Sequence, residues 1–139
     1  MIFFDTNVIL DILDRSRDNH DKALMLLSAA QKGAIKVVAT TQSIVDAAYV
    51  RTQTHKSSLS DFRRVMAALC DIIAVCPVTS MAIEDANASA LPDFEDAVQL
   101  SCAICEECEA IVTSDRKFKS FTTIPTYSVD EFYRVVFSE

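Results

Sequence analysis

The chain of 139 residues is long enough for one domain, 1–139, with a sizeable core, and half of its residues are apolar. Its 13 basic and 20 acidic residues give a net charge of −7, which argues against a broad basic surface for nucleic acid. The lone glycine, Gly33, excludes Gly-rich phosphate loops and dinucleotide-binding fingerprints, and the two histidines form no HExxH motif of zinc proteases.

The first part of the chain alternates apolar segments with helical patterns. The predicted elements are a strand at 1–4, a helix at 8–13, a helix between Asn19 and Gly33, a strand at 35–39 and a helix from Thr41. The apolar stripe of the last helix is predicted to comprise Ile44, Val45, Ala48 and Tyr49. Asp46 then lies near the edge of this stripe, where an acid can reach inward without entering the core.

The rest of the chain continues the alternation after a polar connection, Arg51 to Ser60. The predicted elements are helices at 61–69, 80–90 and from Pro92 onward, strands at 72–75 and 110–113, and a final helix at 129–136 capped by Ser128. The stripe of the helix after Pro92 is predicted to be Ala97, Leu100, Ile104 and Cys108. This alternation predicts an α/β sandwich around a mostly parallel sheet.

Acidic residues stand at the ends of predicted strands and at the starts of predicted helices. Asp5 and Asp115 follow strands, whereas Asp46 and Asp96 lie near helix starts. Ligands of such sheets bind beyond the carboxyl ends of the strands, where strand order reverses, so the four acids can meet at one edge. Gathered carboxylates repel one another unless a hard cation such as Mg²⁺ or Mn²⁺ compensates, and such a cation favours phosphodiester hydrolysis.

Other acidic residues and the cysteines have simpler interpretations. The acids that we assign to capping or solvated positions are Asp11, Asp14, Asp18, Asp21, Asp61, Asp71, Asp85 and Glu95. Five cysteines without a secretion signal predict reduced thiols, and the Cys102-Cys105-Cys108 spacing within a predicted helix favours packing over metal binding. With no apolar run of about 20 residues, we expect a cytoplasmic protein that does not enter membranes.

Three motifs together resemble the signature of a known family. They are Asp5-Thr6-Asn7 after an apolar strand, Asp93-Phe94-Glu95-Asp96-Ala97 at a helix start, and Thr113-Ser114-Asp115 followed by Phe118. Their order and spacing along nearly the whole chain are similar to those of PIN-domain ribonucleases, particularly the VapC-like toxins of toxin–antitoxin pairs. The resemblance implies a three-layer α/β/α fold and a metal-dependent endoribonuclease that uses Mg²⁺ or Mn²⁺.

The resemblance also implies roles for individual residues. The catalytic and metal-binding quartet would be Asp5, Asp46, Asp96 and Asp115, with Asp93 as an auxiliary metal ligand, Thr6 and Asn7 orienting the first acid, and Ser114 beside the last. The implied partners are an RNA substrate such as a transfer RNA, a second copy of the chain in a homodimer, and a cognate antitoxin protein. Arg116 and Lys117 are the foremost candidates for contacts with RNA phosphates, ahead of Lys119, Arg15 and Arg17.

One position departs from the family pattern, because Asp46 stands where the family usually has Glu. Its side chain is one methylene shorter, and a misplacement of about 1 Å can cost on the order of a hundredfold in rate. A catalytically weak or inactive PIN-like module that binds RNA or a partner protein is therefore the alternative. A phosphatase with Asp5 as nucleophile is a third interpretation, disfavoured because haloacid-dehalogenase-like phosphatases have Asp where this chain has Asn7.

Overall fold

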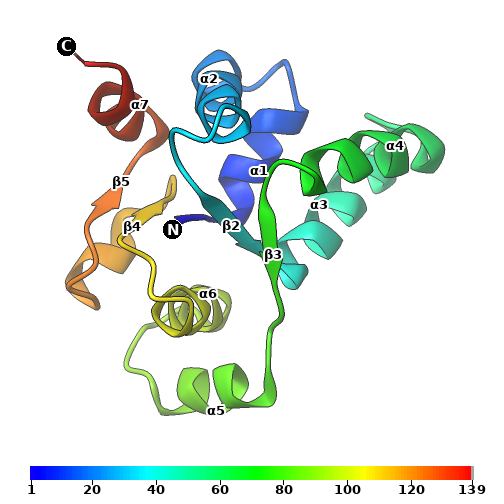
Figure 1. The fold of residues 1–139 in the computed structure, drawn as a ribbon. Helices are drawn as coiled ribbons and strands as arrows, with labels where there is room; N and C mark the ends of the chain where they lie inside the picture. The colour runs from blue at the N-terminus through cyan, green and yellow to red at the C-terminus, as the bar shows by residue number, and fades with distance from the viewer. Residues whose placement is uncertain (139) are drawn as a thin grey trace.

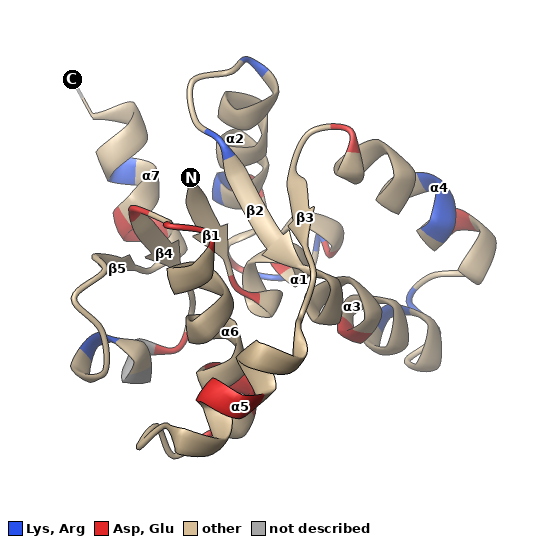
Figure 2. Ribbon diagram, turned by 60° about the horizontal axis from the view of Figure 1, so that its bottom comes forward, with Lys and Arg blue, Asp and Glu red and all other residues tan. Residues whose placement is uncertain are grey.

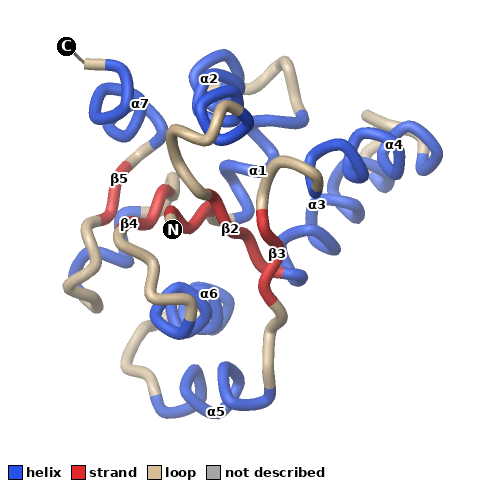
Figure 3. Tube along the Cα trace, in the orientation of Figure 1, coloured by secondary structure: helices blue, strands red, loops and turns tan. Residues whose placement is uncertain are grey.

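The computed structural model describes residues 1–138, except for the side chains of Arg116 and Lys117. Its strands are β1 (Ile2–Phe4), β2 (Val37–Thr40), β3 (Ala74–Cys76), β4 (Ala110–Val112) and β5 (Thr126–Tyr127). They form one sheet in the order β3-β2-β1-β4-β5, and every neighbouring pair is parallel. Figure 3 shows this sheet at the centre of the molecule with helices on both sides.

Helices cover both faces of the sheet (Figure 1). They are α1 (Thr6–Leu13), α2 (His20–Gln31), α3 (Thr41–Gln53), α4 (Leu59–Cys70), α5 (Ser80–Ala88), α6 (Phe94–Cys105) and α7 (Val129–Phe137), with a short 3₁₀ helix at Arg116–Ser120. On one face, Phe4 and Val112 pack against residues of α1 to α4 and α7. On the other face, Phe3 and Ile111 pack against α5 and α6. The predicted three-layer α/β/α sandwich is therefore confirmed.

The order of the strands reverses beside β1. The chain steps from β1 to β2 and β3 on one side, and then to β4 and β5 on the other. Phe4 pairs with Val112, and the backbone N–H of Asp5 donates a 3.0 Å hydrogen bond to the Val112 carbonyl. The segments that follow β1 and β4 therefore leave the sheet side by side, which is where a crevice opens in folds of this kind.

Two predicted apolar stripes differ from the structure. In α3, Val45 and Tyr49 are 63% and 69% exposed, whereas Ser43 and Ala47 are buried. Beside the buried Ser43, which lies 2.7 Å from the Thr6 hydroxyl of α1, the predicted Ile44 and Ala48 are partly buried against the core. The hydrophobic residues on the outer side of α3 therefore gave a misleading helical period.

The end of α6 was also predicted too late. The helix stops at Cys105, and Glu107 follows with a positive φ of 55°, so Cys108 lies beyond the helix although it is buried. Ile104, predicted to be in the core, is 56% exposed. The earlier members of this stripe, Ala97 and Leu100, are buried as predicted. Within the described part of the chain, no helix is long and apolar enough to cross a membrane.

Candidate active site

A cleft of about 440 Å³ opens at the point where the strand order reverses. Its lining comprises Asp5, Thr6, Asn7, Leu10, Asp46, Tyr49, Val50, Asp93, Glu95, Asp96 and Asp115. All five acids predicted for the site thus share one cleft with the two residues that follow Asp5. A sixth carboxylate, that of Glu95, joins them.

Asp5 has its carboxylate fixed by three hydrogen bonds at the end of β1. Oδ1 accepts a hydrogen bond of 2.9 Å from the backbone N–H of Thr6, so that Asp5 caps the N-terminus of α1. The same oxygen accepts a hydrogen bond of 3.0 Å from Nε2 of Gln99. Oδ2 accepts 2.8 Å from the Thr113 hydroxyl. The side chain is only 5% exposed, so these bonds set the direction in which its remaining lone pairs face the cleft.

A buried polar network beneath the cleft supports this arrangement. The Gln99 amide nitrogen also donates 2.9 Å to Oγ of Ser43, and the Gln99 oxygen accepts 2.8 Å from the Thr40 hydroxyl. Ser43 is linked in turn to the Thr6 hydroxyl at 2.7 Å. The network joins β1 and α1 to β2, α3 and α6, so one set of bonds positions several walls of the cleft.

The sequence did not indicate that Thr40, Ser43, Gln99 and Thr113 support Asp5, whereas Thr6 was expected to orient it. A signal was present for Gln99, which lies three positions after Asp96 within the otherwise apolar run Ala97 to Leu100. A polar side chain in such a run has to find buried partners. Thr113 is buried and bonds Asp5, whereas the predicted Ser114 is exposed and does not line the cleft.

Asp96 is the most perturbed acid of the cleft. The N–H of Asp96 donates 3.0 Å to Oδ1 of Asp93, which caps α6, so the local fold of this helix start brings the two acids together. Burial, followed by the charges of Asp93 and Asp115, raises the pKa of Asp96 to about 7. Its Oδ2 is buried without a hydrogen-bond partner, which leaves a lone pair available to a ligand.

Glu95 and Asp46 lie close to each other in the cleft. Oδ1 of Asp46 accepts 2.9 Å from Nε2 of Gln42, one turn earlier in α3. Burial, followed by the charges of Asp46 and Asp5, raises the pKa of Glu95. Glu95 is exposed, as expected of a solvated group, but it also lines the cleft beside the other acids, which the sequence did not indicate.

The side chains of the cleft have the right donor atoms for a hard divalent cation, but they are not close enough together to coordinate one. Carboxylate oxygens are the preferred ligands of Mg²⁺ and Mn²⁺, and the unpartnered Oδ2 of Asp96 is such a donor. Among the residues that the structure describes, no three acidic, histidine or cysteine side chains are gathered tightly enough to form a metal site as they stand. Binding a cation therefore requires the other carboxylates of the cleft to rotate toward the fixed Asp5.

The predicted phosphate contacts are only partly placed. The side chains of Arg116 and Lys117 lie outside the described part of the chain. Lys119 and Arg15 are exposed, and Nε of Arg17 instead donates 2.7 Å to Asp11, which gives Arg17 a structural partner. Figure 2 shows basic residues on α2, α4 and α7, and Lys22 of α2 and Arg134 of α7 both pair with Asp130.

Comparisons with known proteins place nearly the whole chain beside proteins of one family. A family model described as PIN domain matches residues 1–117. Ribonuclease VapC1 of Aquifex aeolicus is 27% identical over 137 residues, which cover 94% of this chain and 92% of the relative.

Solved structures share the fold at low sequence identity. The VapC20 toxin of Mycobacterium tuberculosis, which cleaves the sarcin–ricin loop, has a TM-score of 0.67 and 16% identity, covering 90% of this chain and 99% of its own. A toxin–antitoxin complex from Klebsiella pneumoniae has a TM-score of 0.65 and 18% identity, and the match covers 93% of this chain and 98% of that chain. VapBC2 of Rickettsia felis, bound to promoter DNA, has a TM-score of 0.64 and 15% identity, and the match covers 91% of this chain and 97% of that chain.

Proposed function

Because this chain belongs to the PIN-domain family, we propose that it hydrolyses RNA phosphodiester bonds as a metal-dependent endoribonuclease. The observation that carries the proposal is the cleft at the strand reversal, where six carboxylates gather around an Asp5 held by three hydrogen bonds. So many acids in one cleft are costly to a fold unless a cation binds among them. Ribonuclease VapC1 is a relative along nearly the whole chain, which favours RNA as the substrate.

Asp5 and Asp96 would be the principal holders of Mg²⁺ or Mn²⁺, with Asp46 and Asp115 completing the set. When bound, the cation supplies polarisation of a phosphoryl oxygen and a water acidified toward neutral pH. Gln99 and Thr113 hold the Asp5 carboxylate in one orientation, so less reorganisation is left for the reaction. Asp96, whose pKa is raised to about 7 by burial and by the charges of Asp93 and Asp115, releases its proton when a cation takes its place.

Glu95 can compensate for the shorter side chain at position 46. The shorter Asp46 withdraws its oxygens from the cleft centre, but Glu95 lines the same cleft. Burial, and next the charge of the nearby Asp46, raise the pKa of Glu95. A carboxylate on a longer side chain is therefore available beside Asp46. This supports an active enzyme over the alternative, a catalytically weak PIN-like module that only binds RNA or a partner protein.

The likeness to toxin–antitoxin complexes supports a role as the toxin of such a pair. The partner would then be a cognate antitoxin, and the substrate a structured RNA such as a transfer RNA. A homodimer is the assembly that the family resemblance favours.

The proposal is tested by incubating end-labelled total RNA with the purified chain, free of antitoxin. The reactions contain Mg²⁺, Mn²⁺ or EDTA, and Asp5→Asn is compared with Asp61→Asn, a change at an exposed helix acid outside the cleft. We expect discrete fragments that require both metal and Asp5, with Asp61→Asn fully active. RNA that is bound but left intact by the wild type in every metal would instead identify the binding module.

A further inference from the structure

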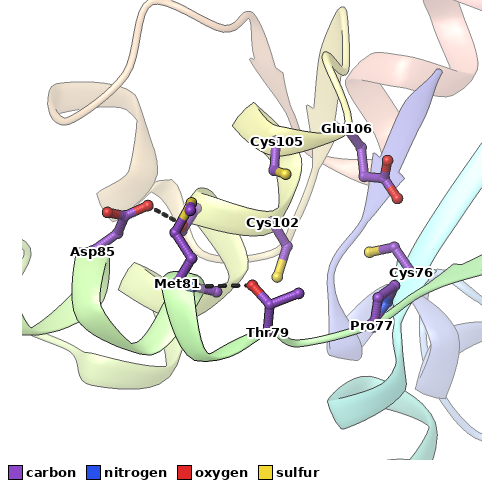
Figure 4. A pocket seen from close by; sticks show the side chains of 10 residues that line it. Cys76, Pro77, Thr79, Met81, Asp85, Cys102, Cys105 and Glu106 are labelled. Atoms are coloured by element: carbon purple, nitrogen blue, oxygen red, sulfur yellow. Dashed lines mark hydrogen bonds between the residues drawn. The ribbon is translucent and has the colours of Figure 1, made fainter.

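A second cavity, of about 240 Å³, lies between α5 and α6 beside the end of β3. It shares no lining residue with the acidic cleft. Three of the five cysteines line it, namely Cys76, Cys102 and Cys105, with Met81 and Glu106 at its edge. Figure 4 shows the sulfur atoms of these cysteines directed into the cavity from two elements, β3 and α6.

Two of these thiols form a pair from distant parts of the chain. Cys76 ends β3, where it pairs with Thr40 of β2, and Cys102 lies in the last turns of α6. Each is only 3% exposed, yet both line the cavity, so a small molecule in it would meet both sulfurs. The two side chains lie close enough for each thiol to shift the pKa of the other. A further cysteine, Cys108 beyond the end of α6, is buried and does not line the cavity.

The contact makes the two sulfurs chemically unequal. The hydrogen bond from Cys76 lowers the pKa of Cys102 against the opposing effect of burial. The same bond, followed by burial, raises the pKa of Cys76 far above its ordinary range. Because the thiolate is the nucleophile in thiol chemistry, Cys102 attacks first and Cys76 is left to resolve the product.

We propose that Cys76 and Cys102 are a redox-active dithiol pair that closes to a disulfide when a hydroperoxide enters this cavity. In the first step, the Cys102 thiolate attacks one peroxide oxygen. An S–O bond forms, the O–O bond breaks, and the departing hydroxide takes a proton to become water, leaving a sulfenic acid. In the second step, Cys76 loses its proton and its sulfur attacks the Cys102 sulfur. The S–S bond forms, the S–O bond breaks, and a second water leaves, so two thiols are oxidised and one peroxide is reduced.

The disulfide would cross-link the edge strand β3 to α6. Gln99 precedes Cys102 by one helical turn, so the link would attach close to the network that supports Asp5. The formation of the pair does not depend on the activity of the acidic cleft. Its test therefore needs no nuclease measurement.

The test uses the double variant Cys70→Ser, Cys105→Ser, because both of these cysteines are exposed and their replacement leaves the buried packing intact. Of the five cysteines, 5 − 2 = 3 remain, namely Cys76, Cys102 and Cys108. The folded protein is treated with hydrogen peroxide, its free thiols are alkylated, and its peptides are mapped by mass spectrometry. Wild-type protein is mapped in parallel.

We expect the double variant to fall from three alkylated thiols to one, with Cys76 joined to Cys102, and dithiothreitol to restore all three. The wild type is expected to show the same linked peptide. Three thiols remaining after peroxide, or a Cys102 oxidised to the sulfinic acid without a link, would overturn the proposal. A bond from Cys102 to Cys105 in the wild type, or to Cys108 in either protein, would overturn it as well.

Discussion

The side-chain amide of Gln99 donates a 3.0 Å hydrogen bond to Oδ1 of Asp5, although the two residues stand 94 positions apart in the chain. The amide nitrogen also donates to Ser43, and the amide oxygen accepts from Thr40. Gln99 is 1% exposed, so water cannot replace these partners. The position of the first acid of the cleft thus depends on a residue of α6 that carries no charge.

Replacing Gln99 by Met keeps the length of the side chain and removes its amide. The buried side chains that form hydrogen bonds with the Gln99 amide then lose a partner, which lowers the free energy of unfolding by about 1–3 kcal/mol. Because Asp5 is no longer fixed, kcat for RNA cleavage falls by on the order of tenfold to a hundredfold. Urea unfolding and single-substrate kinetics measure the two effects.

The matched control is Gln42→Met, since the exposed Gln42 also bonds an acid of the cleft, Asp46, at 2.9 Å. Its unfolding free energy should stay within about 0.5 kcal/mol of the wild type. Equal losses of stability in the two variants would contradict the role given to the buried amide.

Thr113 and Ser114 provide a second matched pair at adjacent positions. The buried Thr113 hydroxyl donates a hydrogen bond of 2.8 Å to Oδ2 of Asp5 and accepts one of 3.0 Å from the backbone N–H of Asp115. Ser114, in contrast, is exposed. Thr113→Val keeps the shape but removes both bonds, so we expect a loss of about 1–3 kcal/mol in unfolding free energy and of most cleavage activity. Ser114→Ala should retain both properties. A larger effect at Ser114 in the same measurements would restore the role that the sequence suggested for it.

The sequence predicted the acids of the cleft because their positions follow from chain order. Asp5 and Asp115 follow apolar strands, and parallel strands bring their carboxyl ends to one edge, so no side-chain detail was needed. The start of the final helix was predicted correctly because Ser128 caps it in a capping box with Glu131, which is a local signal.

The remainder could not be predicted because it depends on tertiary contacts. β5 has only two residues, Thr126 and Tyr127, too few for an alternating pattern, and it exists because β4 offers a free edge. The place of Glu95 in the cleft lining was not predicted because sequence alone does not say which way the first turn of α6 faces. The partners of Gln99 come from β1, β2 and α3, so only the folded chain shows them.

The pKa of Asp96 predicts how stability changes with pH when metal is absent. Burial, followed by the charges of Asp93 and Asp115, raises this pKa to about 7 in the folded chain, compared with about 3.9 for an unperturbed aspartate. A raised acid pKa contributes stability that is complete below about pH 4 and is lost as pH rises through about 7.

In EDTA, the free energy of unfolding of the wild type should therefore decline between about pH 4 and 7. Asp96→Asn cannot ionise, so it should lack this decline and be more stable than the wild type at about pH 8. Chemical unfolding across this range measures both curves. Parallel curves for the two proteins would show that Asp96 titrates as an ordinary acid.

Asp14, which does not line the cleft, is predicted to act in the opposite direction. It accepts 2.7 Å from the Ser16 hydroxyl and pairs with Lys56 at 2.9 Å and with Arg51 at 3.5 Å. The Ser16 hydrogen bond, followed by that of Lys56, holds the pKa of Asp14 well below its usual range. Its contribution to stability is therefore present above about pH 4 and is lost as pH falls through the folded pKa.

Asp14→Asn should lower the free energy of unfolding at neutral pH by about 1–3 kcal/mol, and this difference should shrink in acid. The exposed Asp18 provides the control, because Asp18→Asn is expected to change stability by less than about 0.5 kcal/mol. Denaturant titrations at neutral and acid pH compare the three proteins. A difference at Asp14 that is independent of pH would assign its effect to packing.

The most direct test of the central claim, that the acidic cleft holds a divalent cation, is calorimetric titration of Mn²⁺ into the purified chain. Asp5→Asn and Asp96→Asn are compared with the wild type and with Asp61→Asn, which changes an exposed acid outside the cleft. We predict that each cleft variant binds Mn²⁺ at least about tenfold more weakly, while Asp61→Asn binds as the wild type does. Equal affinity in all four proteins would contradict the claim and place any cation elsewhere.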